Sequence, residues 1–407
     1  MDLAEIDLSS PDAFVEGTPH AWFRALRAQA PVFWHPEKDG PGYWCVTKYE
    51  DLKYVSRNPQ LFSSWLGATN IHTPPPEGLE RTRMIMLNMD PPQHVKFRRI
   101  VQRGFTPRRI GEQEAHIREL ARRIVDAVAP RGEAEFVEEL AAELPLQVIC
   151  EMMGVPLEDR KRIFDLSNTM IGFDDPELGA DESRRMEASA GIFSYALQLA
   201  ARYKERPEDN LTSVLLRSEI DGENLTELEY CSFFLLLCIA GNETTRTVTT
   251  NGWKLLMEHP DQLELLVREP ARIPAAVEEI LRYDPAVHYF RRTATQDTEL
   301  RGRRIRKGDK VVMWYPSANR DEDVFPDPDR FDVTREPNEH LAFGIGEHYC
   351  LGASLARLEL RVIFEELVRR LRRPRLTAPA RRLRSNFING VKEMRIAFEA
   401  EPARPGS

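Results

Sequence analysis

A single long helix candidate constrains the fold of this chain more than any other feature of its sequence. It begins at Thr226, whose hydroxyl can cap the first turn while Glu229 reaches back, the pattern of a capping box. The helical pattern continues to about His259, just before Pro260. Such a helix is roughly 50 Å long. We expect it to cross the whole molecule and to lie at its centre.

Length and composition predict one large domain. The chain has 407 residues, of which 42% are hydrophobic, and this length exceeds the usual ceiling of roughly 250–300 residues for one core. No internal repeat or long flexible linker divides it, since Thr73–Gly78 and Arg206–Asn210 are only short polar breaks. We therefore expect a single domain over residues 1–407.

Helical periodicity dominates the chain. Over residues 112–129, for example, Ile117, Ala121, Ile124 and Val128 share one helix face. Strand patterns are fewer, and the clearest are Tyr43–Val46, Lys310–Tyr315 and Met394–Ala400. The expected fold is mainly α with a small β region.

Charge and targeting features exclude several classes of protein. The net charge of −9 argues against a nucleic-acid-binding protein that relies on overall charge. The acidic N-terminus lacks a secretory signal, and the longest apolar run, Cys231–Ala240, is about half of the ~20 residues that span a membrane. We expect no membrane anchor. Five scattered cysteines without a CxxC pair are typical of a reducing cytoplasm.

Cys350 lies in a glycine-rich segment, Phe343–Gly352, directly before the helical pattern Ala353–Leu371. A helix N-terminus favours an anionic sulfur and lowers the pKa of its thiol, and glycines let the backbone approach a flat ligand. This arrangement suits a thiolate that binds a metal. A buried structural cysteine is one alternative. A zinc site with His340 and His348 is another, although a fourth ligand at a suitable spacing is missing.

The middle of the long helix carries an unexpected polar segment, Ala240–Thr245. Gly241 costs about 1 kcal/mol relative to alanine in a helix interior. A threonine hydroxyl that bonds to the preceding turn can bend or open a helix. We therefore expect the helix to open at Gly241 and form a small polar notch, with an exposed stretch or a simple kink as the alternative.

Together these segments resemble the motifs of the cytochrome P450 family. The Cys350 loop matches FxxGxxxCxG, Ala240–Thr244 matches [AG]GxxT, Glu279–Arg282 matches ExxR, and Pro328–Phe331 matches PxRF. The resemblance covers the chain from about Trp22 to Phe398. It implies a triangular helical prism with a small β region, and haem b between the long helix and the Cys350 loop.

The resemblance also implies roles for the residues of these motifs. Cys350 is the axial thiolate ligand of the haem iron, within a haem-binding loop that includes Phe343 and Gly344. Glu243 brings protons from solvent, and Thr244 positions a proton donor beside dioxygen. The structural network that braces the haem loop consists of Glu279, Arg282 and Arg330.

By the same resemblance, Asp90–Arg99 starts the helix that anchors the haem propionates. His94 and Arg98 are four residues apart, so both can reach one carboxylate region. Arg292 is the expected second propionate arginine, with the adjacent Arg291 as an alternative, and His348 adds a hydrogen bond.

Two further segments, Arg292–Gly302 and Arg384–Lys392, look most like those of actinobacterial enzymes that hydroxylate methyl-branched lipids, sterol side chains or related terpenoids. Matching positions supply candidate substrate contacts, which are apolar or aromatic as a lipophilic guest requires. They are Trp65, Met170, Phe173, Ile239, Val287, Phe290 and Phe387.

The implied reaction is insertion of one oxygen atom from O2 into a C–H bond of a lipophilic substrate. The chain has no GxGxxG fingerprint and no cysteine cluster, so electrons from NAD(P)H are expected through a separate ferredoxin and ferredoxin reductase. One alternative is a peroxygenase that uses hydrogen peroxide, against which the Glu243–Thr244 pair argues. Another is a haem sensor or lipid carrier without catalysis. Candidate docking residues for the ferredoxin are Lys96, Arg98, Arg99, Arg103, Arg108 and Arg109.

Overall fold

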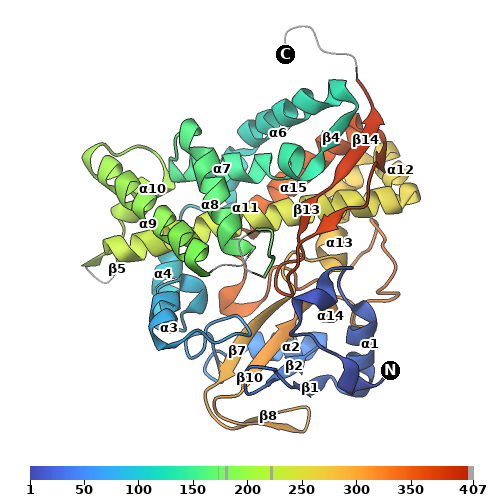
Figure 1. The fold of residues 1–407 in the computed structure, drawn as a ribbon. Helices are drawn as coiled ribbons and strands as arrows, with labels where there is room; N and C mark the ends of the chain where they lie inside the picture. The colour runs from blue at the N-terminus through green and yellow to red at the C-terminus, as the bar shows by residue number, and fades with distance from the viewer. Residues whose placement is uncertain (173, 179–181, 221–222, 402–407) are drawn as a thin grey trace.

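The helix α11, Glu227–Glu258, runs through the middle of the molecule (Figure 1). The structure is a computed structural model that describes residues 1–172, 174–178, 182–220 and 223–401. Thr226 and Glu229 form the predicted capping box, and His259 ends the helix before Pro260. Most residues of α11 are buried, as expected for a helix that other helices surround.

Besides α12 (Pro260–Arg268), which directly follows it in the chain, five α-helices pack extensively against α11 in the described part of the molecule. They are α7 (Glu143–Met153), α8 (Arg160–Ile171), α9 (Glu182–Glu205), α13 (Ile273–Tyr283) and α15 (Ala353–Arg370). The remaining helices are α1 (His20–Gln29), α2 (Tyr49–Arg57), α3 (Pro76–Arg83), α4 (Gln93–Gln102), α5 (Pro107–Glu112), α6 (Glu114–Val128), α10 (Leu211–Leu216) and α14 (Tyr315–Ala318).

The β region is small. A five-stranded sheet has the order β1-β2-β10-β7-β3, in which only β10 and β2 are parallel. Its strands are β1 (Val32–His35), β2 (Tyr43–Val46), β10 (Lys310–Trp314), β7 (Tyr289–Ala294) and β3 (Phe62–Ser63). A second sheet has the order β11-β14-β4, with bounds Arg372–Leu376, Arg395–Glu399 and Glu133–Glu135. The hairpin strands are β5 (Glu219–Ile220), β6 (Glu223–Asn224), β8 (Thr298–Leu300), β9 (Arg303–Ile305), β12 (Arg381–Arg382) and β13 (Val391–Glu393).

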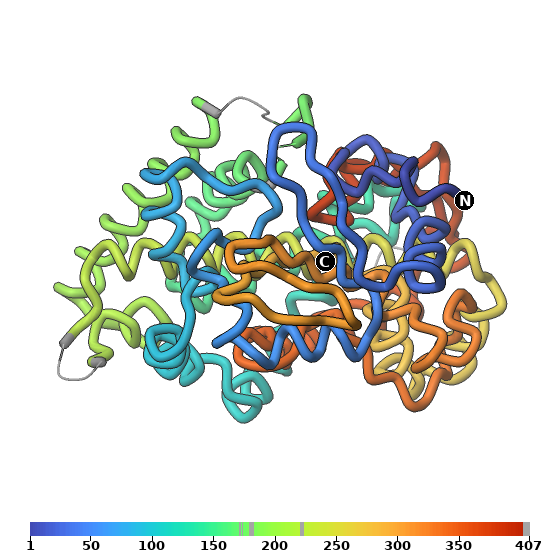
Figure 2. The backbone as a smooth tube through the Cα atoms, turned by 90° about the horizontal axis from the view of Figure 1, so that it is seen from below, coloured from blue at the N-terminus to red at the C-terminus, as the bar shows by residue number. Residues whose placement is uncertain are grey.

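Segments from opposite ends of the chain meet beside the five-stranded sheet. Figure 2 shows the blue N-terminal segment next to red C-terminal loops. Asn386 Nδ2 donates hydrogen bonds to the carbonyl oxygens of Leu8 and Ser9 at 3.1 and 3.0 Å. The C-terminal loop that carries Phe387 is thereby held against the sheet.

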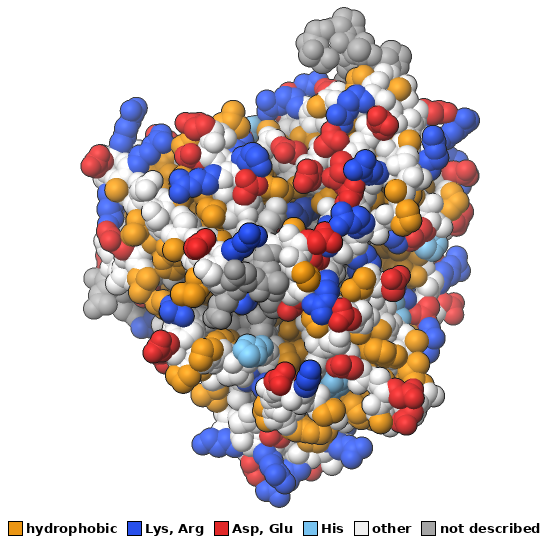
Figure 3. Space-filling model, in the orientation of Figure 1, with side chains coloured by type: hydrophobic (Ala, Val, Ile, Leu, Met, Phe, Trp, Pro, Cys, Tyr) orange, Lys and Arg blue, Asp and Glu red, His pale blue; other side chains and the backbone are white. Residues whose placement is uncertain are grey.

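Charged side chains of both signs are interspersed on the face shown in Figure 3. Within the described part of the chain, no helix is both long enough and apolar enough to cross a membrane. The apolar segment of α11 is instead covered by neighbouring helices.

Candidate functional site

The Cys350 loop is a tight turn that leads into α15. Gly344 and Gly346 have positive φ angles of 68° and 77°, which other residues rarely adopt. A Cβ atom on Gly346 would lie 2.8 Å from the carbonyl oxygen of Ser56. The backbone N–H of Cys350 donates to the carbonyl oxygen of Phe343 at 2.9 Å. The glycines therefore permit a turn that the Phe343–Cys350 hydrogen bond closes.

The surroundings of Cys350 affect its thiol in opposite directions. Burial raises the pKa of the Cys350 thiol, while the Gly352 N–H, Arg98 and Arg357 act to lower this pKa. The Gly352 N–H thus acts in the predicted direction, but in the polypeptide alone the loss of hydration outweighs it. A coordinated metal cation would supply the charge that makes a thiolate stable here.

Four basic side chains gather next to this loop. The rings of His94 and His348 lie 4.1 Å apart between centroids. Burial lowers the pKa of His94 to about 4 with help from Arg98 and Arg292, and it also lowers the pKa of His348. Among the described residues, Arg98 and Arg292 bond only to carbonyl oxygens, of Tyr349 and Arg291.

This group of bases fits an anionic ligand. His94 Nδ1 is buried without a hydrogen-bond partner, and no described carboxylate pairs with Arg98 or Arg292. Buried cations and donors of this kind need negative charge nearby. The two carboxylates of a haem would satisfy them, with Cys350 as the iron ligand.

Strand alternation separates the two candidate arginines on β7. Arg291 donates to the carbonyl of Ile71 and to Thr73 Oγ1, at 3.2 and 2.6 Å. Arg292 instead affects the pKa values of His94 and His348, so it lies in their group. Successive side chains of a strand point to opposite faces. The structure therefore favours Arg292 over Arg291.

The polar segment of α11 stays helical. Thr244 Oγ1 donates to the carbonyl oxygen of Ala240 at 2.9 Å, as expected for a threonine that bonds to the preceding turn. The predicted opening at Gly241 is wrong, because the α-helix continues through it. A Cβ on Gly241 would lie 3.0 Å from Ile149, so glycine serves close packing against α7. Ala240 is nevertheless exposed, so this face of α11 is accessible.

Glu243 is buried and ion-paired with Arg246 on the same helix. Arg246 Nη1 also donates to Asn168 Oδ1 on α8 at 2.9 Å. All three residues line a cavity of about 80 Å³. Arg246 was not identified from the sequence, although its position three residues after Glu243 is a signal for such a pair.

The bracing network differs from the prediction in one residue. Arg282 pairs with Glu279 at 2.7 Å, and both side chains are fully buried. Arg330 was expected to complete the network, but its side chain is 67% exposed and only its backbone carbonyl takes part. Arg335 occupies that position, with its Nε 3.2 Å from Glu279. The chain turns between the two arginines and directs the later one inward.

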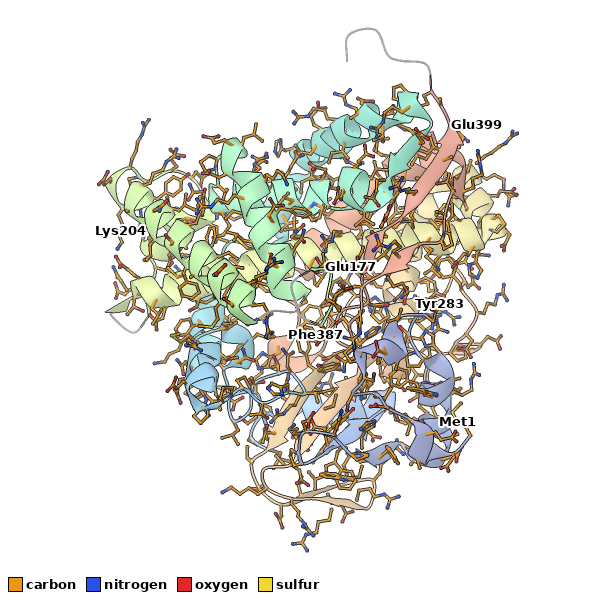
Figure 4. All side chains as sticks on the ribbon, viewed as in Figure 1. Met1, Glu177, Lys204, Tyr283, Phe387 and Glu399 are labelled. Atoms are coloured by element: carbon orange, nitrogen blue, oxygen red, sulfur yellow. The ribbon has the colours of Figure 1, made fainter. Side chains whose placement is uncertain are left out.

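The candidate substrate contacts do not all lie together. Ile239, Val287 and Phe387 pack around the buried residues Leu383 and Ile388. Figure 4 shows Phe387 between α11 and the five-stranded sheet, and its ring lies 5.8 Å from that of Phe290.

Trp65 and Met170 pack against the large core cluster instead. Arg83 lies over the Trp65 ring at 5.0 Å. Phe173 lies outside the described residues.

The zinc alternative finds no support in the part of the chain that the structure describes. No three histidine, cysteine, aspartate or glutamate side chains there are arranged to hold a metal ion. His340 pairs with Glu278 at 3.0 Å, and His348 Nε2 lies 3.3 Å from Ser64 Oγ.

A cysteine in a glycine turn before α15, basic side chains that fit two carboxylates, and a central helix with an accessible hydroxyl together indicate the class of haem-thiolate proteins. The sequence profile described as Cytochrome P450 matches residues 76–387. The chain belongs to the cytochrome P450 family, and it is a haem-dependent monooxygenase with haem b as its cofactor.

Several known proteins are similar over almost the whole chain. A methyl-branched lipid omega-hydroxylase of Mycobacterium tuberculosis is 44% identical, over 97% of this chain and 95% of its own length. A steroid C26-monooxygenase of Rhodococcus jostii is 43% identical, over 97% of this chain and 84% of that protein. A Mycobacterium marinum cytochrome P450 in complex with pseudoionone has a TM-score of 0.91 and 38% identity, covering 97% and 98% of the two chains. These matches confirm the predicted fold.

Proposed function

We propose that this monooxygenase hydroxylates an elongated apolar substrate, such as a methyl-branched lipid, an isoprenoid or a sterol side chain, near one end. The observation that carries the proposal is the apolar group formed by Ile239, Val287 and Phe387, of which Ile239 lies on α11 five residues before Thr244. The relatives that act on methyl-branched lipids and steroids support the same substrate class.

The site residues divide the work as follows in this proposal. Cys350 holds the haem, and His94, Arg98, Arg292 and His348 hold its carboxylates. When bound, haem b supplies the iron centre at which dioxygen is activated. The apolar group excludes water and orients the substrate.

Proton delivery belongs to α11. Thr244 Oγ1 is the hydroxyl that positions the proton beside dioxygen. Glu243 borders the cavity of about 80 Å³ from which water can replace that proton. Arg246 keeps the Glu243 carboxylate in place through their ion pair.

We further propose that the electrons come from a separate ferredoxin and its reductase, in the cytoplasm. The exposed side chains of Lys96, Arg99, Arg103, Arg108 and Arg109 on and around α4 and α5 support docking of an acidic donor. None of the five cysteines, all of which lie in the described residues, is joined in a disulfide, which supports a reducing compartment.

Ligand titration of the ferric haem protein tests the substrate class. Methyl-branched fatty acids and sterols should produce the blue-shifted Soret band that accompanies loss of the water ligand. Phe387→Ala should weaken their binding about tenfold, because burial of an aromatic ring contributes roughly 1.5–3 kcal/mol. Leu157→Ala, at a side chain that is 71% exposed, is the control. Tight binding of only small polar compounds would contradict the substrate class and leave the family assignment intact.

A further inference from the structure

Glu278 connects the two ends of the Cys350 loop. It lies on α13 next to Glu279, but the two carboxylates contact different segments of the chain. Its carboxylate accepts hydrogen bonds from Arg357 Nε and Nη2, at 2.7 and 2.8 Å. His340 Nε2 also lies 3.0 Å from this carboxylate. His340 precedes the loop and Arg357 follows it on α15, so one acid holds both flanks.

The His340 ring is held in one tautomer. The backbone N–H of Ala342 donates to His340 Nδ1 at 3.2 Å, so this nitrogen accepts. The proton on Nε2 is therefore directed to Glu278. The His340 side chain is only 2% exposed, and its arrangement is more constrained than that of a surface ion pair.

Arg357 transmits this restraint to the residues that position the cysteine. Its guanidinium lies 4.5 Å from the centre of the Phe343 ring, and its Nη1 donates to Tyr349 Oη at 3.1 Å. Phe343 accepts the hydrogen bond of the Cys350 N–H, and Tyr349 directly precedes Cys350. Arg357 thus contacts the side chains of two residues whose backbones hold that of Cys350.

The Glu278 carboxylate is stabilised in its charged form. Arg357 and His340 overcome the effect of burial and lower the pKa of Glu278 to about 2. The neighbouring Glu279 instead binds Arg282 and Arg335, which hold the segment around Pro326–Arg330. Two adjacent carboxylates on α13 therefore brace two different segments.

We propose that Glu278 is a positioning residue for thiolate ligation, which acts through His340 and Arg357 to keep the Cys350 loop in its ligating conformation. It touches neither substrate nor haem iron in this proposal. Its loss is expected to release the loop while the helical fold persists.

The test compares Glu278→Gln with Glu269→Gln. Glu269 forms an exposed ion pair with Arg272 at 2.6 Å just before α13 and has no contact with the loop. The haem proteins are warmed in steps, and the strongly red-shifted Soret band of the ferrous–CO complex is followed together with far-ultraviolet circular dichroism. Glu278→Gln should lose the red-shifted band several-fold faster than the wild type, at temperatures where the helical signal is unchanged. Glu269→Gln should match the wild type.

Arg357→Lys provides a second variant, which keeps the charge but loses the paired hydrogen bonds and the stacking on Phe343. It should also lose the red-shifted band early. Adding Glu278→Gln to this variant should have a smaller effect than it has in the wild type, because the paired contact with Arg357 is already lost and only the contact with His340 remains. A wild-type rate of band loss in Glu278→Gln, or a loss that coincides with global unfolding, would overturn the proposal.

Discussion

At the scale of single residues, the structure distinguishes side chains that look equivalent in the sequence. Arg330 and Arg335 are five positions apart, yet only Arg335 contacts the buried Glu279. Arg291 and Arg292 are adjacent, yet only Arg292 joins the basic group near Cys350. In both pairs, the backbone conformation directs the two arginine side chains to opposite sides, and this direction determines which one reaches the site.

Arg335→Ala should therefore be much more harmful than Arg330→Ala. Removing one partner of the fully buried Glu279 is expected to cost about 3 kcal/mol of unfolding free energy, whereas an exposed side chain contributes within about 0.5 kcal/mol. Denaturant unfolding of the haem proteins measures both values. Equal losses in the two variants would mean that Arg330 belongs to the network after all.

Thr244→Ala should separate electron consumption from product formation. Alanine favours the helix at least as well as threonine, so α11 should stay intact. Without the hydroxyl, proton positioning fails, and NAD(P)H consumption should yield mainly hydrogen peroxide, with coupling reduced several-fold. The ratio of hydroxylated product to NAD(P)H consumed, with peroxide measured in parallel, is the test. Unchanged coupling would remove the Thr244 hydroxyl from proton delivery.

At the scale of elements, the boundaries follow local chemistry closely. α11 ends where His259 precedes Pro260, and α15 begins at Ala353 as predicted. The strand expected over Lys310–Tyr315 ends at Trp314, because Tyr315 begins the short helix α14. The Cys350 loop is held between α13 and α15 by the charged contacts of Glu278, so its stability should depend on pH.

Glu278 should contribute to this dependence in acid. Its pKa falls from an ordinary 4.5 to about 2 in the folded protein, so its stabilisation is present above about pH 4.5 and is lost as the pH falls towards 2. The shift corresponds to roughly 3 kcal/mol at neutral pH. Urea unfolding of wild type and Glu278→Gln at pH 7 and near pH 3 should give converging free energies. A difference that is as large near pH 3 as at pH 7 would contradict this assignment.

At the scale of the whole molecule, one apolar cluster includes residues from Met86 to Phe398. Its continuity supports a single domain, which stays a prediction. The chain is acidic overall, yet exposed arginines gather on and around α4 and α5. α4 also carries Arg98, which donates a hydrogen bond to the carbonyl oxygen of Tyr349, the residue before Cys350. An acidic electron donor would meet this region by electrostatic attraction.

Arg103→Glu should therefore slow reduction by an acidic ferredoxin several-fold at low ionic strength. The difference from wild type should vanish at high salt, because exposed charges are screened over about 10 Å at 0.1 M. Arg268→Glu on α12, which lies at the other end of α11 (Figure 1), is the matched control. Stopped-flow reduction rates that are independent of salt and of Arg103 would exclude docking here.

The sequence by itself determined the features that depend on neighbouring residues. The capping box of Thr226, the glycine turn before Cys350 and the back-bonded hydroxyl of Thr244 all follow from short-range geometry. Motif spacing then sufficed to identify the family and the candidate ligand.

Only the tertiary structure decided which distant segments meet. It placed Arg335 rather than Arg330 on Glu279, and it kept α11 unbroken because Gly241 packs against α7. It also joined His340 and Arg357 through Glu278, a residue for which the sequence predicted no partner. A buried charge is costly unless an opposite charge lies beside it. Which opposite charge lies beside it depends on how the chain folds, and the separation of the two residues in the sequence does not determine this.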